Sequence, residues 1–170
     1  MTYTPQDGFP YYLEFVKGMD CLSLYTSSSN FKLLDSLTEE QGDYRYAPGK
    51  WSIKQVVGHI TDHERIMISR AFFTSRKEPV ELWGYDQNLL VNNSRFEELS
   101  LSQLITDFEN VRKASASFVA SLSTSQMSIK GNAGRFEVRL EDFLRSIIGH
   151  EMHHVDIIQE RYLTSDAYKA

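Results

Sequence analysis

The stretch that decides the fold is WSIKQVVGHITDHERIMISRAFFTS, residues 51–75. Its apolar side chains recur with helical spacing, at positions 53, 56, 57, 60, 67, 68 and 71. This 3.6-residue period predicts an amphipathic α-helix that opens at about Trp51 and ends near Ser75. An amphipathic helix buries its apolar stripe against other elements, so the fold class follows from the type of element that packs against this helix.

Three further segments have helical patterns. One begins after Pro10 and runs to about Leu37 through a serine-rich stretch at 26–30, which is a poor helix interior and indicates a kink or a fray. Another spans Leu101 to about Leu122, and the last runs from about Leu140 to Leu163. Four long helices predict an all-α four-helix bundle, a single domain over residues 1–170.

The segments between the helices predict one long connection. Residues 76–100 lose the helical period and include Pro79, so we expect a crossover with one short turn of helix. Residues 41–50 are interpreted as a loop and residues 131–134 as a turn. Strand candidates such as 135–140 are too few and too short to predict a stable sheet.

Composition excludes several classes of function. The chain has 170 residues, 41% of them hydrophobic, and a formal charge of −5, which disfavours binding to nucleic acid or to anionic membranes. Cys21 is the single cysteine, so no intrachain disulfide forms. The sequence shows no leader pattern and no apolar run long enough to cross a bilayer. We therefore expect a soluble, cytoplasmic protein.

All five histidines fall in two short clusters, GHITDH at 58–63 and HEMHH at 150–154. On the last helix His150 and His154 lie one turn apart on the margin of the apolar face, whereas His153 lies outside it. An i, i+4 histidine pair is a common chelating unit, and a third ligand must then come from another helix. His59 and His63 both lie on the flank of the apolar face of the second helix. His63 lies closer to that face, so its angular position slightly favours it as the third ligand.

Three motifs carry a family resemblance. YAPGKWSIKQVVGH at 46–59, followed by GHEMHH at 149–154 and ERYL at 160–163, resembles the DinB/YfiT-like superfamily. The resemblance implies a four-helix bundle with a three-histidine metal site formed by His59, His150 and His154, and it overrules the angular preference for His63. It also implies a divalent ion, Zn²⁺ or Ni²⁺. Members of the superfamily with a known activity include thiol-dependent transferases such as bacillithiol S-transferases, and mycothiol-dependent isomerases.

Three neutral imidazoles leave a divalent ion with an open position, where water or a thiol becomes a nucleophile at neutral pH. We expect a small-molecule substrate, and a low-molecular-weight thiol as a co-substrate because Cys21 is interpreted as a core residue. The alternative is a non-catalytic metal-binding stress-response bundle. Apolar residues left over on the first and third helices are compatible with a homodimer.

Glu64 and Glu151 lie inside the predicted apolar faces, where an unpaired charge is costly. They are candidate catalytic residues, as a base or as partners that orient a ligand imidazole, and the alternative is a buried ion pair with Arg65, Arg70 or Arg112. On the long connection, Trp83, Tyr85, Asp86 and Gln87 either pack as an ordinary loop or close the mouth of the site.

Overall fold

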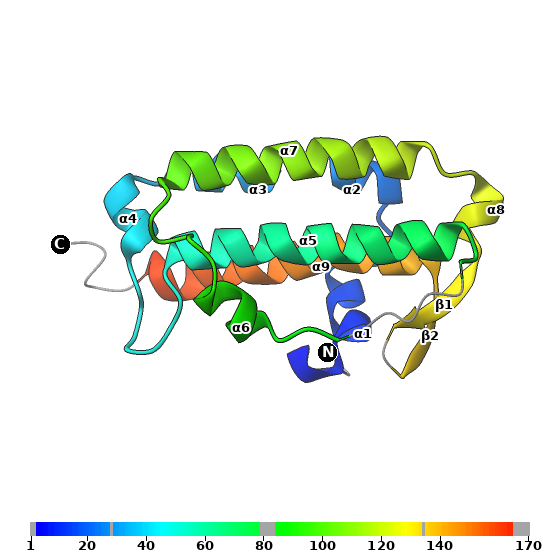
Figure 1. Ribbon diagram of the computed structural model, residues 1–170, viewed down its shortest axis with the longest axis horizontal. Helices are drawn as coiled ribbons and strands as arrows, with labels where there is room; N and C mark the ends of the chain where they lie inside the picture. The colour runs from blue at the N-terminus through cyan, green and yellow to red at the C-terminus, as the bar shows by residue number, and fades with distance from the viewer. Residues whose placement is uncertain (1–2, 28, 79–83, 134, 165–170) are drawn as a thin grey trace.

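The structure is a computed structural model that describes residues 3–27, 29–78, 84–133 and 135–164. It is an all-α four-helix bundle with a small β-hairpin at one end (Figure 1). The long helices are α5 (Ile53–Ser75), α7 (Leu101–Ala120) and α9 (Leu140–Ile157), and the fourth position is shared by α2 (Cys21–Thr26) and α3 (Ser29–Asp35). The short elements are η1 (Pro5–Asp7), α1 (Phe9–Leu13), η2 (Glu14–Val16), α4 (Glu39–Asp43), α6 (Gln87–Asn92), α8 (Thr124–Met127), β1 (Lys130–Ala133), β2 (Phe136–Arg139) and the π-helix η3 (Ile158–Tyr162).

The long connection is a crossover, as the sequence predicts. In Figure 1, α5 and α7 run in the same direction and α9 runs in the opposite direction. The chain must therefore return to the starting end of α5 before α7 begins, and α6 contacts α5 at that end. This topology places the segment around α6 beside the N-terminal half of α5.

The prediction of one helix from residue 11 to 37 is wrong. The chain leaves the helical conformation at Gly18, which has a positive φ of 77° that favours glycine, and it starts again when Asp20 caps α2. The serine-rich stretch separates α2 from α3, as the weak helix signal indicates. The broken element still fills one bundle position, because α2 and α3 both pack against α7.

Helix α4 and the β-hairpin are among the short elements that were missed, because their sequences are too brief to show a period. Helix α4 occupies part of the predicted 41–50 loop, and its start is fixed by a capping box between Thr38 and Gln41. Residues 131–133 belong to β1, which pairs antiparallel with β2, so the prediction of a turn there is wrong; Gly134 lies outside the described residues. The hairpin leads directly into α9, where the Leu140 backbone N–H donates to the Ile129 carbonyl.

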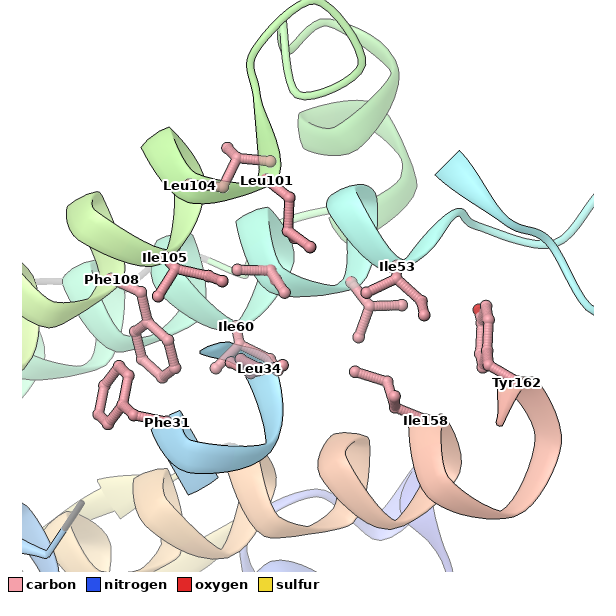
Figure 2. Close-up of a cluster of buried hydrophobic side chains, with 12 residues drawn as sticks. Phe31, Leu34, Ile53, Ile60, Leu101, Leu104, Ile105, Phe108, Ile158 and Tyr162 are labelled. Carbon is pink, nitrogen blue, oxygen red and sulfur yellow. The ribbon is translucent and has the colours of Figure 1, made fainter. Parts of the chain in front are cut away.

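The apolar core is divided into two clusters along the bundle. Figure 2 shows the first, where side chains from α3, α5, α7 and η3 point toward one another. The second gathers around α2, the end of α5 and the first half of α9, and it includes the buried Cys21. Arg112, Glu64 and Glu151 are all buried at intermediate positions on α7, α5 and α9. Among the described residues, no helix combines the length and the apolar character needed to cross a bilayer.

Candidate metal centre

Helix α5 carries His59 in its second turn, and the start of that helix is fixed locally. The Ser52 hydroxyl accepts from the Gln55 backbone N–H at 3.2 Å, while the Gln55 side chain accepts from the Ser52 backbone N–H at 3.0 Å. This reciprocal capping box satisfies two N–H groups that a helix start otherwise leaves unpaired. His59 is therefore held on a rigid element, and only 3% of its surface is exposed.

Helix α9 brings a pair of histidines to the same place. Nε2 of His150 lies 3.2 Å from Nε2 of His59 and 3.2 Å from Nε2 of His154. One ligand atom from each of the three side chains lies within 4.8 Å of the other two. The structure thus brings together the three histidines implied by the family resemblance.

The spacing of these nitrogens fits a metal ion. In a tetrahedral site with Zn–N bonds of about 2.0–2.1 Å, neighbouring ligand nitrogens are about 3.3 Å apart. Burial lowers the pKa of His59 to about 4 and holds the pKa values of His150 and His154 well below the ordinary value, with neighbouring histidines adding to the effect. All three rings are therefore neutral at pH 7, as metal ligation requires.

Glycines placed directly before His59 and His150 let other segments approach the site closely. A Cβ at Gly58 would lie 2.5 Å from the ring of Phe96, and a Cβ at Gly149 would lie 2.0 Å from the carbonyl oxygen of Tyr12. Neither position has room for a side chain. The glycines allow the segment before α7 and helix α1 to seal the two ligand-bearing turns.

His63, which the angular argument prefers, is not one of the three converging residues. Its ring stacks on that of His150, with centroids 3.7 Å apart and an interplanar angle of 19°. Its Nδ1 is hydrogen-bonded to the Tyr85 hydroxyl at 2.6 Å. His63 therefore packs against His150 and links that ring to Tyr85 of the crossover, a role that the sequence pattern does not reveal.

The His150 ring is held by its neighbours on both sides. The ring of Tyr12 contacts it edge-on, with centroids 4.9 Å apart, whereas the ring of His63 stacks on it nearly parallel. Within the described part of the chain, its buried Nδ1 has no hydrogen-bond partner. Ring packing thus replaces the hydrogen bond that usually orients a ligand imidazole.

Glu64 and Glu151 both bind Arg112. The guanidinium donates to the Glu64 carboxylate at 2.7 Å and 3.1 Å and also to Glu151, and all three residues are at most 5% exposed. The two glutamates therefore form the buried ion pair that was the alternative to a catalytic role, and Arg112 is the cation. Arg65 instead pairs with Asp62 and Asp107 at the surface.

The other residues singled out in the sequence have separate places. His153 is hydrogen-bonded through Nδ1 to the Tyr11 hydroxyl at 3.2 Å. Asp86 caps α6, and Gln87 lines a pocket beside His154. Trp83 lies outside the described residues. The connection therefore contributes Tyr85 and Gln87 to the surroundings of the site.

Comparisons with known proteins agree with this architecture. A sequence profile of the DinB superfamily matches residues 27–158. The fold is similar to that of YfiT from Bacillus subtilis, described as a probable metal-dependent hydrolase with an unusual four-helix bundle topology. The two share 16% sequence identity over 94% of this chain and 89% of that one, with a TM-score of 0.69. A search of curated proteins found no significant match.

Proposed function

The chain belongs to the DinB superfamily, and from that premise we propose that it is a metal-dependent enzyme acting on a small substrate through His59, His150 and His154. The observation that carries the proposal is the convergence of three neutral Nε2 atoms, with 3.2 Å between His150 and each of the others. Three protein ligands leave a coordination position for a reactant, whereas a structural zinc site normally has four.

A divalent ion held by neutral imidazoles supplies the positive charge that makes water or a low-molecular-weight thiol nucleophilic at neutral pH. Imidazole ligands suit both zinc and nickel. Water leads to hydrolysis, the chemistry given in the description of YfiT, and a thiol leads to transfer. Cys21 is buried in the second core cluster, and burial raises the pKa of its thiol to about 12, so an attacking thiol would come from a co-substrate.

The surrounding residues hold and shield the site. Trp51 lies against His59, with ring centroids 4.9 Å apart, and Tyr12 covers His150. These contacts pack aromatic rings against two of the three histidines. His63, fixed by Tyr85, supports the His150 ring from behind. Glu64 and Glu151 serve here as positioning residues: through Arg112 they connect α5 to α9 close to the ligands.

Elemental analysis of protein purified without added metal tests the first step. We expect about one ion per chain in the wild type and His153→Ala, and loss of the ion in His59→Ala and His154→Ala, because His153 faces Tyr11 instead of the cluster. Equal metal contents in all four proteins would contradict the site. Turnover of 4-nitrophenyl esters, and conjugation of a thiol to an electrophilic arene, should then depend on the metal. Bound metal without any metal-dependent turnover would favour the non-catalytic bundle.

A further inference from the structure

A pocket of about 260 Å³ opens beside His154. Its walls come from the loop before α5, from α6 and from the end of α9 with η3. Val56 and Tyr162, each 2% exposed, form its buried apolar part, while Lys50, Arg161, Gln87 and Asn88 are exposed around it. His154 and Trp51 border both this pocket and the histidine cluster. A ligand in the pocket therefore lies next to the proposed metal position.

The charge around this pocket has one sign. Lys50 and Arg161 line it, and no acidic side chain does so among the described residues, although the chain as a whole carries a charge of −5. Neither cation forms an ion pair with any described residue. Most of the other arginines are paired with carboxylates, so this pocket is distinguished by two cations that pair with no carboxylate of the described residues.

Arg161 is also positioned by its surroundings. It belongs to η3, where the helix widens and the Leu163 backbone N–H donates to the Ile158 carbonyl at 3.0 Å. Such π-helical turns occur frequently at functional sites. Its guanidinium lies 5.9 Å from the centre of the Tyr46 ring, a cation–π contact that limits its freedom while leaving its N–H groups available. Gln87 and Asn88 add amide donors on the facing wall.

We propose that this pocket binds the anionic group, a carboxylate or a phosphate, of the small substrate whose reacting centre lies at the histidine cluster. Lys50 provides a point charge and Arg161 a planar fork of donors, the two forms in which proteins bind such anions. The aromatic and apolar side chains of Trp51, Val56 and Tyr162 would contact the carbon skeleton. The inference rests on the proposed function, because that proposal places the reacting centre at the histidine cluster. The titration below measures anion binding and does not depend on turnover.

Calorimetric titration of zinc-loaded and metal-free protein with succinate, with methylphosphonate and with neutral succinamide tests the pocket. We expect at least one of the anions to bind about tenfold or more tightly than succinamide in the wild type. Lys50→Met/Arg161→Met should abolish that preference. The matched control is Lys17→Met/Arg76→Met, which removes the same two charges from exposed positions outside the pocket, and Arg76 likewise lies over an aromatic ring, that of Phe72. Which anion binds more tightly distinguishes a carboxylate from a phosphate substrate.

Equal anion preference in the two double variants would overturn the inference, because the anion would then be held elsewhere. So would equal binding of succinamide and both anions by the wild type. Turnover of 4-nitrophenyl esters that carry a carboxylate, a phosphonate or neither group separates this inference from the proposed function. Turnover with no preference for either anionic ester counts against the pocket alone, whereas anion binding without turnover counts against the enzymatic proposal alone.

Discussion

The ring of His63 lies flat against the ring of His150, with 3.7 Å between their centroids. The contact joins α5 to α9, and the two residues are 87 positions apart in the sequence. His63 is also hydrogen-bonded to the Tyr85 hydroxyl through its Nδ1. The three-histidine cluster is thus packed against a fourth histidine, which is not one of the three proposed ligands.

The variants His63→Phe and His63→Ala distinguish a histidine that packs against His150 from one that binds the metal ion. Removing the ring should weaken zinc binding about tenfold, as loss of outer contacts around a metal site does, whereas phenylalanine preserves the stack and most of the affinity. Zinc competition with a chromophoric chelator measures both variants. If His63 were a ligand, His63→Phe would lose as much affinity as His154→Ala.

Gly149→Ala should destabilise the protein by about 2 kcal/mol, even though alanine is the better helix former by about 1 kcal/mol. The reason is the 2.0 Å separation between the new Cβ and the Tyr12 carbonyl oxygen, a backbone atom that cannot rotate away. Urea unfolding measures the effect. Gly84→Ala is the control, since nothing lies within 4 Å of a Cβ there. A stabilised Gly149→Ala variant would show that α1 does not pack against this turn.

Arg112→Met should cost about 3–5 kcal/mol of unfolding free energy, because it leaves two buried carboxylates without their cation. Adding Glu64→Gln and Glu151→Gln to the same chain should recover part of that loss. For comparison, Arg65→Met breaks a surface pair whose arginine side chain is 44% exposed, and it should cost less than about 1 kcal/mol. Equal losses in Arg112→Met and Arg65→Met would argue against a buried network.

The metal-free protein should lose stability as the pH falls below 7. Burial lowers the pKa of His59 to about 4, while the unfolded chain titrates near 6.5, so between these values only the unfolded state takes up the proton. His59 alone then accounts for about 2 kcal/mol between pH 7 and pH 5. Urea unfolding at pH 7, 6 and 5 measures the slope. His59→Gln should reduce it, and a flat profile in the wild type would contradict a buried neutral ring.

The sequence predicted the parts of the fold that have long periodic patterns. Helices α5, α7 and α9 begin within two residues of the predicted starts, and the crossover with its short helix lies where the period is lost. The first helix was predicted too long because apolar spacing alone does not indicate the break in helical conformation at Gly18. Helix α4 and the hairpin depend on local capping and on pairing between short strands, neither of which produces a period.

The three histidines that converge were predictable as a set of residues, but their arrangement was not. Helix geometry identified the pair His150 and His154, and the family resemblance supplied His59 in place of His63. The choice between these two depends on how α5 and α9 face each other, which an angle within one helix does not determine. Similarly, the sequence offered three arginines for Glu64 and Glu151, and packing against α7 selected Arg112.

The converging nitrogens of His59 and His150 come from opposite sides of the crossover, so cutting the chain between α5 and α7 would leave each fragment with an incomplete ligand set. Any opening that separates α5 from α9 dismantles the centre, even if every helix stays intact. The rate at which a bound ion is transferred to a chelator would consequently measure how often α5 separates from α9.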